Sequence, residues 1–423
     1  MKLGVIGLGY VGLVTGVGFA SMGHIVKGFD IDADKVKALN ERKSPLYEVG
    51  LDVGLKEAGD RFTATQKLSD LNDCEVIFVC VGTPSREDGS IDLYYVKKAA
   101  EDLSKMLDSY KVIVIKSTVV PGTTDSIIPI LESEGKLSGK DFGVAMNPEF
   151  LREGTALKDF FEPDRIVIGA TDEKTREALL DLYEPFNCPK IFTNMKTAEM
   201  IKYASNAFLA TKISFINEIG NICKKLGIDT YHVADGIGYD KRIGRAFLDS
   251  GIGFGGSCFP KDVKALIAMA ESLGEEPKIL KEVIHLNERQ PLRKIDLIKK
   301  RGISLKDKKI AVLGLSFKPH TDDVRESRAV PLIEALLKDG AIVYAHDPQG
   351  AENMKKLLPE GAYENLFYLD DPQEAVDNGE IVLLTTNWPH FKELDFKDKL
   401  VLDGRNVIPK EIRSKMDYEG VCW

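Results

Sequence analysis

The sequence predicts an α/β protein in which two parallel-sheet domains are joined by a helical middle domain containing one long central helix. In the first half of the 423-residue chain, short apolar segments bounded by turn residues alternate with helical patterns, and this alternation returns after Leu305. The region between them shows helical periodicity alone. Strands that alternate with helices form βαβ units and parallel sheets. We therefore expect domains at residues 1–195, 196–295 and 296–423.

Composition limits the class of protein. A chain of this length exceeds one ordinary core, and 43% hydrophobic with 29% charged residues is typical of a globular protein. The net charge of −9 argues against nucleic-acid or membrane-surface partners. No signal-peptide pattern or apolar stretch of about 18 residues is present. The six cysteines are scattered without CxxC pairs, so we expect no metal site and a reduced, cytoplasmic protein.

The first region contains six apolar segments with the length and flanking turn residues of buried strands. They are 3–6, 25–29, 76–80, 112–115, 143–146 and 165–168. Helical patterns at 35–41 and 94–107 fall between some of them. This succession favours one mostly parallel sheet.

The middle region begins with a long helical pattern. From Thr197 to Leu226 there is no proline, and Gly220 is the only glycine. Apolar residues recur near a 3.6-residue period and occupy more than one side, so we expect one long helix buried in a core or an interface. Helical patterns at 262–272 and 279–288 complete the middle domain.

The third region resumes the alternation of strands and helices. Strands are predicted at 309–315, 341–346, 381–385 and 400–402. A helix predicted at 329–338 is closed by Gly340, a residue typical of helix C-termini. This region is expected to form the second sheet domain.

A glycine-rich turn, 7–12, follows the first predicted strand and opens a helix expected at 14–22. In a GxGxxG turn, the glycines allow a tight turn, a close approach of a pyrophosphate and close helix–strand packing. The second predicted strand ends at Asp30, whose carboxylate is suited to the adenosine ribose hydroxyls and favours NAD over NADP. Lys35 is either a ribose-side contact or a solvated residue. The first domain is therefore predicted to be Rossmann-like and NAD-binding.

Other polar residues follow predicted strands. Thr83 and Thr118 lie where ligands of open α/β sheets bind, at the carboxyl ends of strands. In the segment after 143–146, Glu149 and Glu153 are either a catalytic carboxylate and a cofactor contact or two loop acids, and their spacing does not decide.

Two cations follow predicted strands of the third region. Lys318 and Arg405 are suited to binding a phosphate or a sugar hydroxyl. An isolated residue of either kind is more often a surface charge.

The most informative segment is 253–262, in which a glycine-rich loop leads into a helix. Ser257 is expected to cap this helix and Pro260 to lie in its first turn. Cys258 then lies at the helix N-terminus with Lys261 nearby, and both features stabilise a thiolate. Most lone cytosolic cysteines are buried and inert. The helix dipole and the glycines favour a reactive cysteine here.

Lys202 and Asn206 are four residues apart on the long helix and therefore share one face. That face continues with the apolar Leu209 and Ile213. Beside a thiolate, the ammonium and the amide would hold a developing oxyanion. The alternative is a solvated polar stripe.

Taken together, these motifs resemble the UDP-glucose 6-dehydrogenase family, within the broader UDP-glucose/GDP-mannose dehydrogenases. The similarity covers nearly the whole chain. Its most specific motifs are NPEFLREG at 147–154, GFGGSCFPKD at 253–262 and FKPHTDDVRES at 317–327.

The resemblance implies a four-electron oxidation at C6 of the sugar that uses two NAD. Cys258 matches the nucleophile that holds the substrate as a thiohemiacetal and then as a thioester. The remaining catalytic matches are Lys202 and Asn206 for oxyanions, Asp262 and Thr118 for water, and Glu149 for proton transfer.

The resemblance also implies binding residues and a partner. Matches for the cofactor are Gly7, Gly9, Tyr10, Val11, Gly12, Asp30, Lys35, Thr83, Thr118, Glu153, Lys261 and Arg325. Matches for the sugar nucleotide are Phe150, Leu151, Lys202, Asn206, Phe247, Gly255, Lys318 and Arg405. Arg242 matches a residue that the family supplies from a neighbouring subunit, so a homodimer is implied.

Four alternatives remain open. One is a UDP-N-acetylhexosamine dehydrogenase, although the loop of those enzymes usually departs from the NPEFLREG found at 147–154. GDP-mannose 6-dehydrogenase shares the cysteine chemistry, although 163–169 and 242–244 look more like the UDP-glucose branch. A two-electron hydroxy-acid or polyol dehydrogenase would use the first domain without needing Cys258. A non-catalytic NAD sensor would have no use for Cys258, Lys202, Asn206 and Asp262 together.

Overall fold

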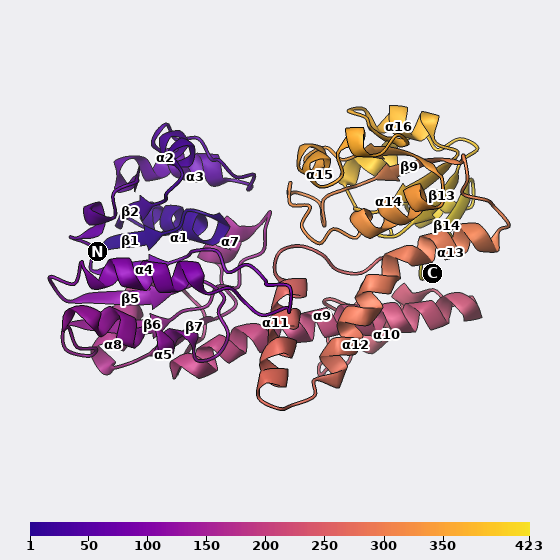
Figure 1. The fold of residues 1–423 in the computed structure, drawn as a ribbon. Coiled ribbons are helices and arrows are strands. Elements are labelled where there is room, and N and C mark those ends of the chain that lie inside the picture. Colours follow the sequence, from indigo (N-terminus) through magenta and orange to yellow (C-terminus); the bar gives the residue numbers. More distant parts are fainter. The chain divides into compact units, whose positions relative to one another are not determined.

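The computed structural model describes residues 1–423 and divides into two compact units, 1–205 and 206–423 (Figure 1). Each unit contains one sheet. The helix α9 (Met195–Leu226) has 32 residues and passes through the boundary between the units. The predicted fold class is confirmed: both sheets are almost entirely parallel, and a helical region with one long helix separates them in the sequence. The division into three domains stays a prediction.

The first unit has an eight-stranded sheet with the order β3-β2-β1-β4-β5-β6-β7-β8. The strands are β1 (Lys2–Ile6), β2 (Ile25–Phe29), β3 (Phe62–Thr65), β4 (Val76–Val79), β5 (Lys111–Ile115), β6 (Phe142–Met146), β7 (Ile166–Ala170) and β8 (Lys190–Thr193). All neighbours are parallel except β6 and β7. The order reverses between β1 and β4, where ligands of such sheets bind.

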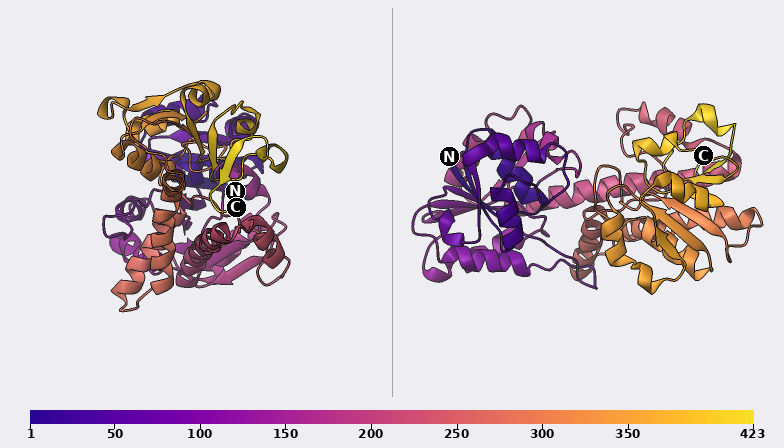
Figure 2. Two further views of the ribbon diagram at one scale, coloured as in Figure 1. Left: turned by 90° about the vertical axis from the view of Figure 1, so that its right-hand side faces the viewer. Right: turned by 90° about the horizontal axis from the view of Figure 1, so that it is seen from above.

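Helices cover both faces of this sheet (Figures 1 and 2). One face packs against α1 (Tyr10–Ser21), α3 (Leu51–Ala58), α7 (Ala156–Phe161) and α8 (Glu173–Tyr183). The other packs against α4 (Tyr94–Ser104), α6 (Ile128–Leu131) and the start of α9. The helices α2 (Ala33–Asn40) and α5 (Thr123–Ser126) complete the unit. Every residue of β4 and β5 is buried, because a parallel sheet covered on both faces exposes neither side of its strands.

The second unit begins with helices and ends with a parallel sheet. Its helices are α10 (Thr230–Gly238), α11 (Phe259–Ser272), α12 (Lys278–Arg289), α13 (Arg293–Lys300), α14 (Ala329–Lys338), α15 (Ala351–Leu357), α16 (Pro372–Asn378) and α17 (Lys410–Arg413). Its strands are β9 (Lys309–Leu313), β10 (Ile342–His346), β11 (Leu366–Tyr368), β12 (Ile381–Leu384), β13 (Leu400–Asp403) and β14 (Asp417–Gly420). The order is β11-β10-β9-β12-β13-β14, with α13 and α14 on one face and α16 on the other.

The ten predicted strands are present, and the four strands that the sequence did not predict are β3, β8, β11 and β14. These are the outer strands of the two sheets. An outer strand pairs on one side only and is short and partly polar, so it lacks the apolar pattern of a central strand. One local prediction is wrong. The residue that caps α11 is Cys258, not Ser257, and no side chain supplies a capping hydrogen bond there.

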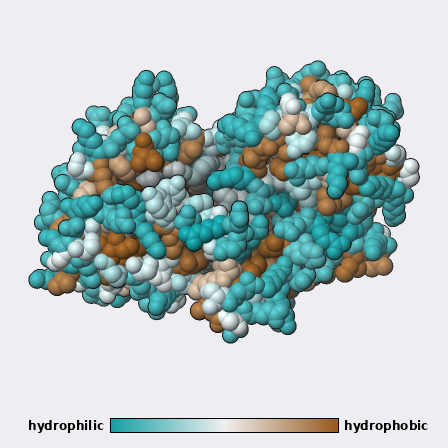
Figure 3. Space-filling model, in the orientation of Figure 1, coloured by the Kyte–Doolittle hydropathy of each residue, from teal (hydrophilic) through white to brown (hydrophobic).

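The visible face of each unit is mainly hydrophilic, with separate hydrophobic patches (Figure 3). None of the helices combines the length and the apolar character that crossing a membrane requires.

Candidate active site

The glycine-rich turn lies between β1 and α1 as predicted. Gly7 has a φ of +89° and donates its N–H to the Phe29 carbonyl at 2.8 Å. A Cβ at Gly12 would lie 1.9 Å from the Gly7 carbonyl oxygen, so only glycine fits there. A Cβ at Gly9 would meet no atom within 4 Å. The backbone at Gly9 and the N-terminus of α1 therefore face open space, which fits a pyrophosphate.

Asp30 is held at the carboxyl end of β2. One carboxylate oxygen accepts hydrogen bonds from the Leu8 N–H (2.8 Å) and the Lys35 ammonium (3.0 Å), and the other accepts from the Asp32 N–H (3.0 Å). These donors fix the carboxylate beside the glycine-rich turn, as expected of a ribose-binding acid. Lys35 contacts Asp30 itself.

Two further predicted cofactor contacts line this turn. The Tyr10 hydroxyl donates to Glu48 (2.6 Å), whose carboxylate also accepts the Gly154 N–H (2.6 Å). Val11 packs against the core beneath α1. Tyr10 thereby connects the start of α1 to the segment after β6.

Thr83 and Thr118 lie at neighbouring strand ends. The Thr83 hydroxyl donates to the Thr118 carbonyl at 3.0 Å, which ties the segment after β4 to the one after β5. Both threonines therefore lie at the carboxyl edge of the sheet, next to the point where the strand order reverses.

Glu149 and Lys202 form a buried ion pair. The Lys202 ammonium lies 2.9 Å from Glu149, and the two residues are 3% and 7% exposed. The second oxygen of Glu149 accepts the Leu151 N–H at 2.5 Å. Burial alone would raise the pKa of Glu149, but the charges of Lys202 and Lys116 and these hydrogen bonds outweigh it and lower that pKa. Glu149 is therefore a carboxylate at neutral pH.

A second buried lysine, which sequence reasoning missed, lies close enough to this pair to interact with both of its charges. Lys116 directly follows β5 and donates to Asn147 at 2.9 Å, and Asn147 also accepts the Tyr183 hydroxyl (2.5 Å). Burial lowers the pKa of Lys116 to about 8. The strand-end reasoning that singled out Thr118 would have found Lys116 as well, because only Ser117 separates them.

The segment after β6 carries three more predicted residues. The Phe150 ring lies 3.6 Å from the Arg165 guanidinium carbon and 5.4 Å from the Lys202 ammonium. Leu151 is partly buried against the core, and Glu153 is partly exposed. Phe150 thus makes cation–π contacts with both Arg165 and Lys202.

Cys258 is the N-cap residue of α11, as the sequence predicted for its position at the helix N-terminus. It is exposed, and its Sγ lies 3.6 Å from the Ser257 hydroxyl. The uncapped N–H groups of the first turn and the helix dipole stabilise a thiolate at this place. Lys261 directs its ammonium to Asp262 at 2.6 Å.

Asp262 accepts hydrogen bonds from two side chains of the second unit. Its carboxylate accepts the Asn206 amide at 2.6 Å and the Lys261 ammonium at 2.6 Å. Asp262 is 1% exposed and lies in the first turn of α11, one turn beyond Cys258. The structure thus brings Asn206, Lys261 and Asp262 together at the first turn of α11, the helix that Cys258 caps.

The loop before Cys258 is fixed by side chains of α12, of the residue that follows α12, and of α9. Asn287 accepts the Phe254 N–H at 2.7 Å and donates to the Phe254 carbonyl at 2.9 Å. Gln290 donates to the Gly251 carbonyl at 2.8 Å, and Asn217 accepts the Gly251 N–H at 2.7 Å. The glycine-rich loop is therefore held by side chains that sequence reasoning did not single out.

The remaining predicted substrate and cofactor residues lie elsewhere in the second unit. Arg242 is exposed and pairs with Asp240 at 2.6 Å, and the Phe247 ring lies 6.1 Å from that of Phe259. Lys318 follows β9 and lies over the Phe317 ring.

The last two predicted residues are arginines of the second unit. Arg405 follows β13 and donates to the Thr385 carbonyl at 3.1 Å. Arg325 pairs with Asp323 at 2.7 Å. The roles predicted for these residues stay predictions.

Sequence profiles of one family match almost the whole chain. The profile of the UDP-glucose/GDP-mannose dehydrogenase family's NAD binding domain matches residues 1–187, that of its central domain 196–289, and that of its UDP binding domain 311–410. The chain belongs to the UDP-glucose/GDP-mannose dehydrogenase family. The resemblance inferred from the motifs is confirmed, and so is NAD as the cofactor.

Individual members of the family are similar over their full length. The UDP-glucose 6-dehydrogenase AglM of Haloferax volcanii is 44% identical, with 100% of both chains covered. The UDP-glucose 6-dehydrogenase TuaD of Bacillus subtilis is 44% identical, covering 99% of this chain and 92% of its own. A UDP-glucose dehydrogenase structure from Pyrobaculum islandicum has a TM-score of 0.94 at 45% identity, covering 100% of this chain and 98% of its own.

Proposed function

We propose that this protein is an NAD-dependent UDP-glucose 6-dehydrogenase that converts the C6 alcohol of UDP-glucose to a carboxylate through a thioester on Cys258. The observation that carries the proposal is the exposed thiol at the N-terminus of α11, one turn from the buried Asp262. Full-length relatives named UDP-glucose 6-dehydrogenase support the choice of substrate.

The proposed reaction balances as two two-electron oxidations and one hydrolysis. The C6 alcohol loses a hydride and a proton and becomes an aldehyde. The Cys258 thiolate adds to this aldehyde, and the alkoxide that forms takes up a proton. The resulting thiohemiacetal loses a second hydride and a proton to give a thioester. Water then attacks the carbonyl, the C–S bond breaks, and the carboxylate and the thiolate are released. NAD held at the glycine-rich turn 7–12 and Asp30 would supply the hydride acceptor for both oxidations. The covalent bond retains the aldehyde between the two oxidations.

The Glu149–Lys202 pair and the cluster of Asn206, Lys261 and Asp262 are assigned roles in this scheme. The Lys202 ammonium and the Asn206 amide stabilise the oxyanions that develop at C6. Glu149, which its neighbours keep ionised, accepts a proton. Asp262 and Thr118 position the hydrolytic water, and Asn206 orients the Asp262 carboxylate.

The binding roles follow the same proposal. The turn at Gly7, Gly9, Tyr10, Val11 and Gly12, with Asp30 and Lys35, holds the adenosine half of NAD. The remaining cofactor contacts are assigned to Thr83, Thr118, Glu153, Lys261 and Arg325. The sugar nucleotide is assigned to Phe150, Leu151, Phe247, Gly255, Lys318 and Arg405. The assignment as NAD-binding (1–195), central (196–295) and UDP-sugar-binding (296–423) domains is proposed with them.

A homodimer is the proposed assembly. Phe208, Phe215 and Ile222 of α9 are 65%, 48% and 52% exposed and recur every seven residues, so they form one apolar stripe on the helix. A second copy of the chain would cover this stripe by helix packing, and Arg242 is proposed to reach the neighbouring subunit's site. A cysteine nucleophile that must stay reduced and the use of NAD both suit the reducing cytoplasm, the proposed location.

The test is to measure NADH released per sugar consumed, using UDP-glucose, GDP-mannose and a 2-hydroxy acid as substrates. The proposal expects two NADH per UDP-glucose, and the Cys258→Ala variant should bind NAD but form no uronate. One NADH per sugar would exclude the thioester, and equal or better turnover of GDP-mannose would replace the substrate.

A further inference from the structure

Glu326 has a backbone conformation that most residues avoid. Its φ is +52°, in the left-handed region, where a residue other than glycine is strained. It lies between Arg325 and Ser327, in the loop that connects β9 to α14. Such a conformation persists only where surrounding contacts enforce it.

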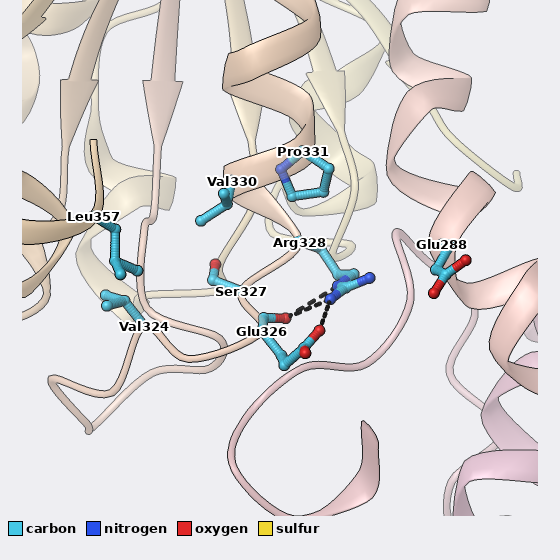
Figure 4. A pocket seen from close by; sticks show the side chains of 8 residues that line it. All are labelled: Glu288, Val324, Glu326, Ser327, Arg328, Val330, Pro331 and Leu357. Atoms are coloured by element: carbon cyan, nitrogen blue, oxygen red, sulfur yellow. Dashed lines mark hydrogen bonds and ion pairs between the residues drawn. The ribbon is translucent and has the colours of Figure 1, made fainter. Parts of the chain in front are cut away.

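Arg328 enforces this conformation. Two nitrogens of its guanidinium, Nε and Nη2, donate to the Glu326 carbonyl at 3.0 and 2.9 Å, and Nη2 also lies 2.9 Å from the Glu326 carboxylate (Figure 4). Arg328 is 6% exposed. A buried, forked guanidinium with three hydrogen bonds to one residue leaves that residue little freedom.

The same carbonyl supports the loop that carries the nucleophile. A Cβ at Gly255 would lie 2.4 Å from the Glu326 carbonyl oxygen, so the loop packs against this atom with no space between them. The neighbouring Gly256 donates its N–H to the Arg325 carbonyl at 2.9 Å. Cys258 follows two residues later.

Glu326 also contacts the helix that follows Cys258. Its carboxylate lies 3.5 Å from Lys264 of α11. The segment 325–328 therefore contacts the chain on both sides of the nucleophile, the loop before it and the helix after it. All these residues belong to the second unit.

We infer that Arg328 and Glu326 are positioning residues. The Arg328 guanidinium holds the Glu326 carbonyl, and this carbonyl positions the Cys258 thiol at the N-terminus of α11. Neither contacts the reacting atoms. The inference rests on the proposed function for its catalytic consequence, but the reactivity of the thiol tests it without any substrate.

A pocket beside Arg328 makes a sharp experiment feasible. Glu288, Val324, Ser327, Val330, Pro331 and Leu357 line it together with Glu326 and Arg328, and its volume is about 330 Å³ (Figure 4). Truncation in the Arg328→Ala variant would extend this pocket to the Glu326 carbonyl. Methylguanidine added to the solution could then occupy the place of the lost guanidinium.

The experiment compares Arg328→Ala, Arg328→Lys and Glu326→Gly with Leu357→Ala. Leu357 also lines the pocket but takes no part in the hydrogen bonds between Arg328 and Glu326. For Arg328→Ala we expect kcat to fall on the order of a hundredfold with little change in the KM for NAD. Methylguanidine should restore part of kcat saturably, whereas urea should not. Arg328→Lys, which lacks the fork, should recover little. Glu326→Gly keeps the carbonyl and adopts the left-handed conformation freely, so it should stay close to the wild type.

The second readout is the rate at which iodoacetamide alkylates Cys258, with Cys258→Ala marking the background. We expect Arg328→Ala to slow alkylation at neutral pH on the order of tenfold, because a thiol displaced from the helix N-terminus is less often a thiolate. Thermal melts establish that each variant is folded.

The outcomes separate the two proposals. Wild-type kcat and alkylation rates in Arg328→Ala would overturn the positioning role. A loss in Glu326→Gly as large as in Arg328→Ala would overturn the carbonyl as the anchoring atom. A wild-type protein that alkylates readily but does not oxidise UDP-glucose would overturn the proposed function alone.

Discussion

The Lys202 ammonium, on the second turn of α9, donates to the Glu149 carboxylate, three residues after β6, at 2.9 Å inside the first unit. The two residues are 53 positions apart in the sequence. Because the pair is buried, each charge is stabilised mainly by the other. Removal of one residue therefore leaves an uncompensated charge in the interior.

Breaking the Glu149–Lys202 pair should destabilise the first unit strongly. We expect Glu149→Gln or Lys202→Met to lower the free energy of unfolding by about 3–5 kcal/mol, and the double variant to recover part of that loss. Urea titration at pH 7 measures all three. Additive losses in the double variant would contradict a direct pair.

The same pair has a defined pH dependence. The folded-state pKa of Glu149 is lowered, so its stabilisation is complete above the unfolded value near 4.5 and is lost as the pH falls through the folded value. The difference between the wild type and Glu149→Gln should therefore shrink in acid.

Substitution of Asp262 should affect hydrolysis of the thioester. The carboxylate is held by Asn206 and Lys261, and loss of a group that activates water typically costs 10²–10⁴-fold, so we expect Asp262→Asn to lower kcat on that order. Acid quenching followed by mass spectrometry should then show a sugar-nucleotide adduct accumulating on Cys258. An unchanged turnover rate would remove Asp262 from the mechanism.

Asp30 should govern the choice between NAD and NADP. We expect Asp30→Ala to raise the Kd for NAD on the order of tenfold, because a hydrogen bond to a charged group is lost. The Kd for NADP should fall, since the carboxylate no longer repels a 2′-phosphate and Lys35 is released. Calorimetric titration with both dinucleotides tests this.

Asp32→Ala is the matched control for that experiment. Asp32 caps α2 and accepts the N–H groups of Asp34 and Lys35, so its loss should weaken the helix without altering cofactor choice. An equal shift in both variants would argue against a specific role of Asp30.

Lys294 should make the free energy of unfolding of the second unit vary with pH above neutrality. It is fully buried, donates to the Leu384 carbonyl at 2.6 Å, and burial lowers its pKa to about 7. Between that value and the unfolded value of 10.5, the unfolded chain binds more protons than the folded one.

The stability of the wild type relative to Lys294→Met should therefore rise with pH across this window, with a slope of up to about 1.4 kcal/mol per pH unit. Urea unfolding at pH 7, 8 and 9 measures the difference. A difference that does not vary with pH would contradict a buried lysine whose charge is lost on folding.

The α9 stripe should control assembly. We expect the double substitution of Phe208 and Phe215 by Glu to convert a dimer to a monomer in sedimentation experiments, because charges would be buried against a second copy. Leu273→Glu, at an equally exposed apolar position after α11, should leave the assembly unchanged. A monomeric wild type would contradict the proposal directly.

Prediction of the fold from the sequence succeeded where the pattern was local and strong. The central strands are apolar along their whole length because helices cover both faces, and this leaves a plain mark in the sequence. The outer strands β3 and β14 carry Thr63 and Glu419 among their few residues and leave no such mark. The cap of α11 was misplaced by one residue, because a serine next to a cysteine is the better capping residue by preference alone.

The sequence by itself determined two local features: the glycine-rich turn at 7–12 and the position of Cys258 at the start of a helix. Each is a pattern of residues that are neighbours in the sequence, so it forms without long-range contacts. Only the tertiary structure decided that Glu149 meets Lys202, that Lys116 lies behind them, and that Arg328 fixes Glu326 against Gly255. These contacts depend on which strand ends and loops become neighbours in the folded protein. The distance between two residues along the sequence does not show whether they will be neighbours.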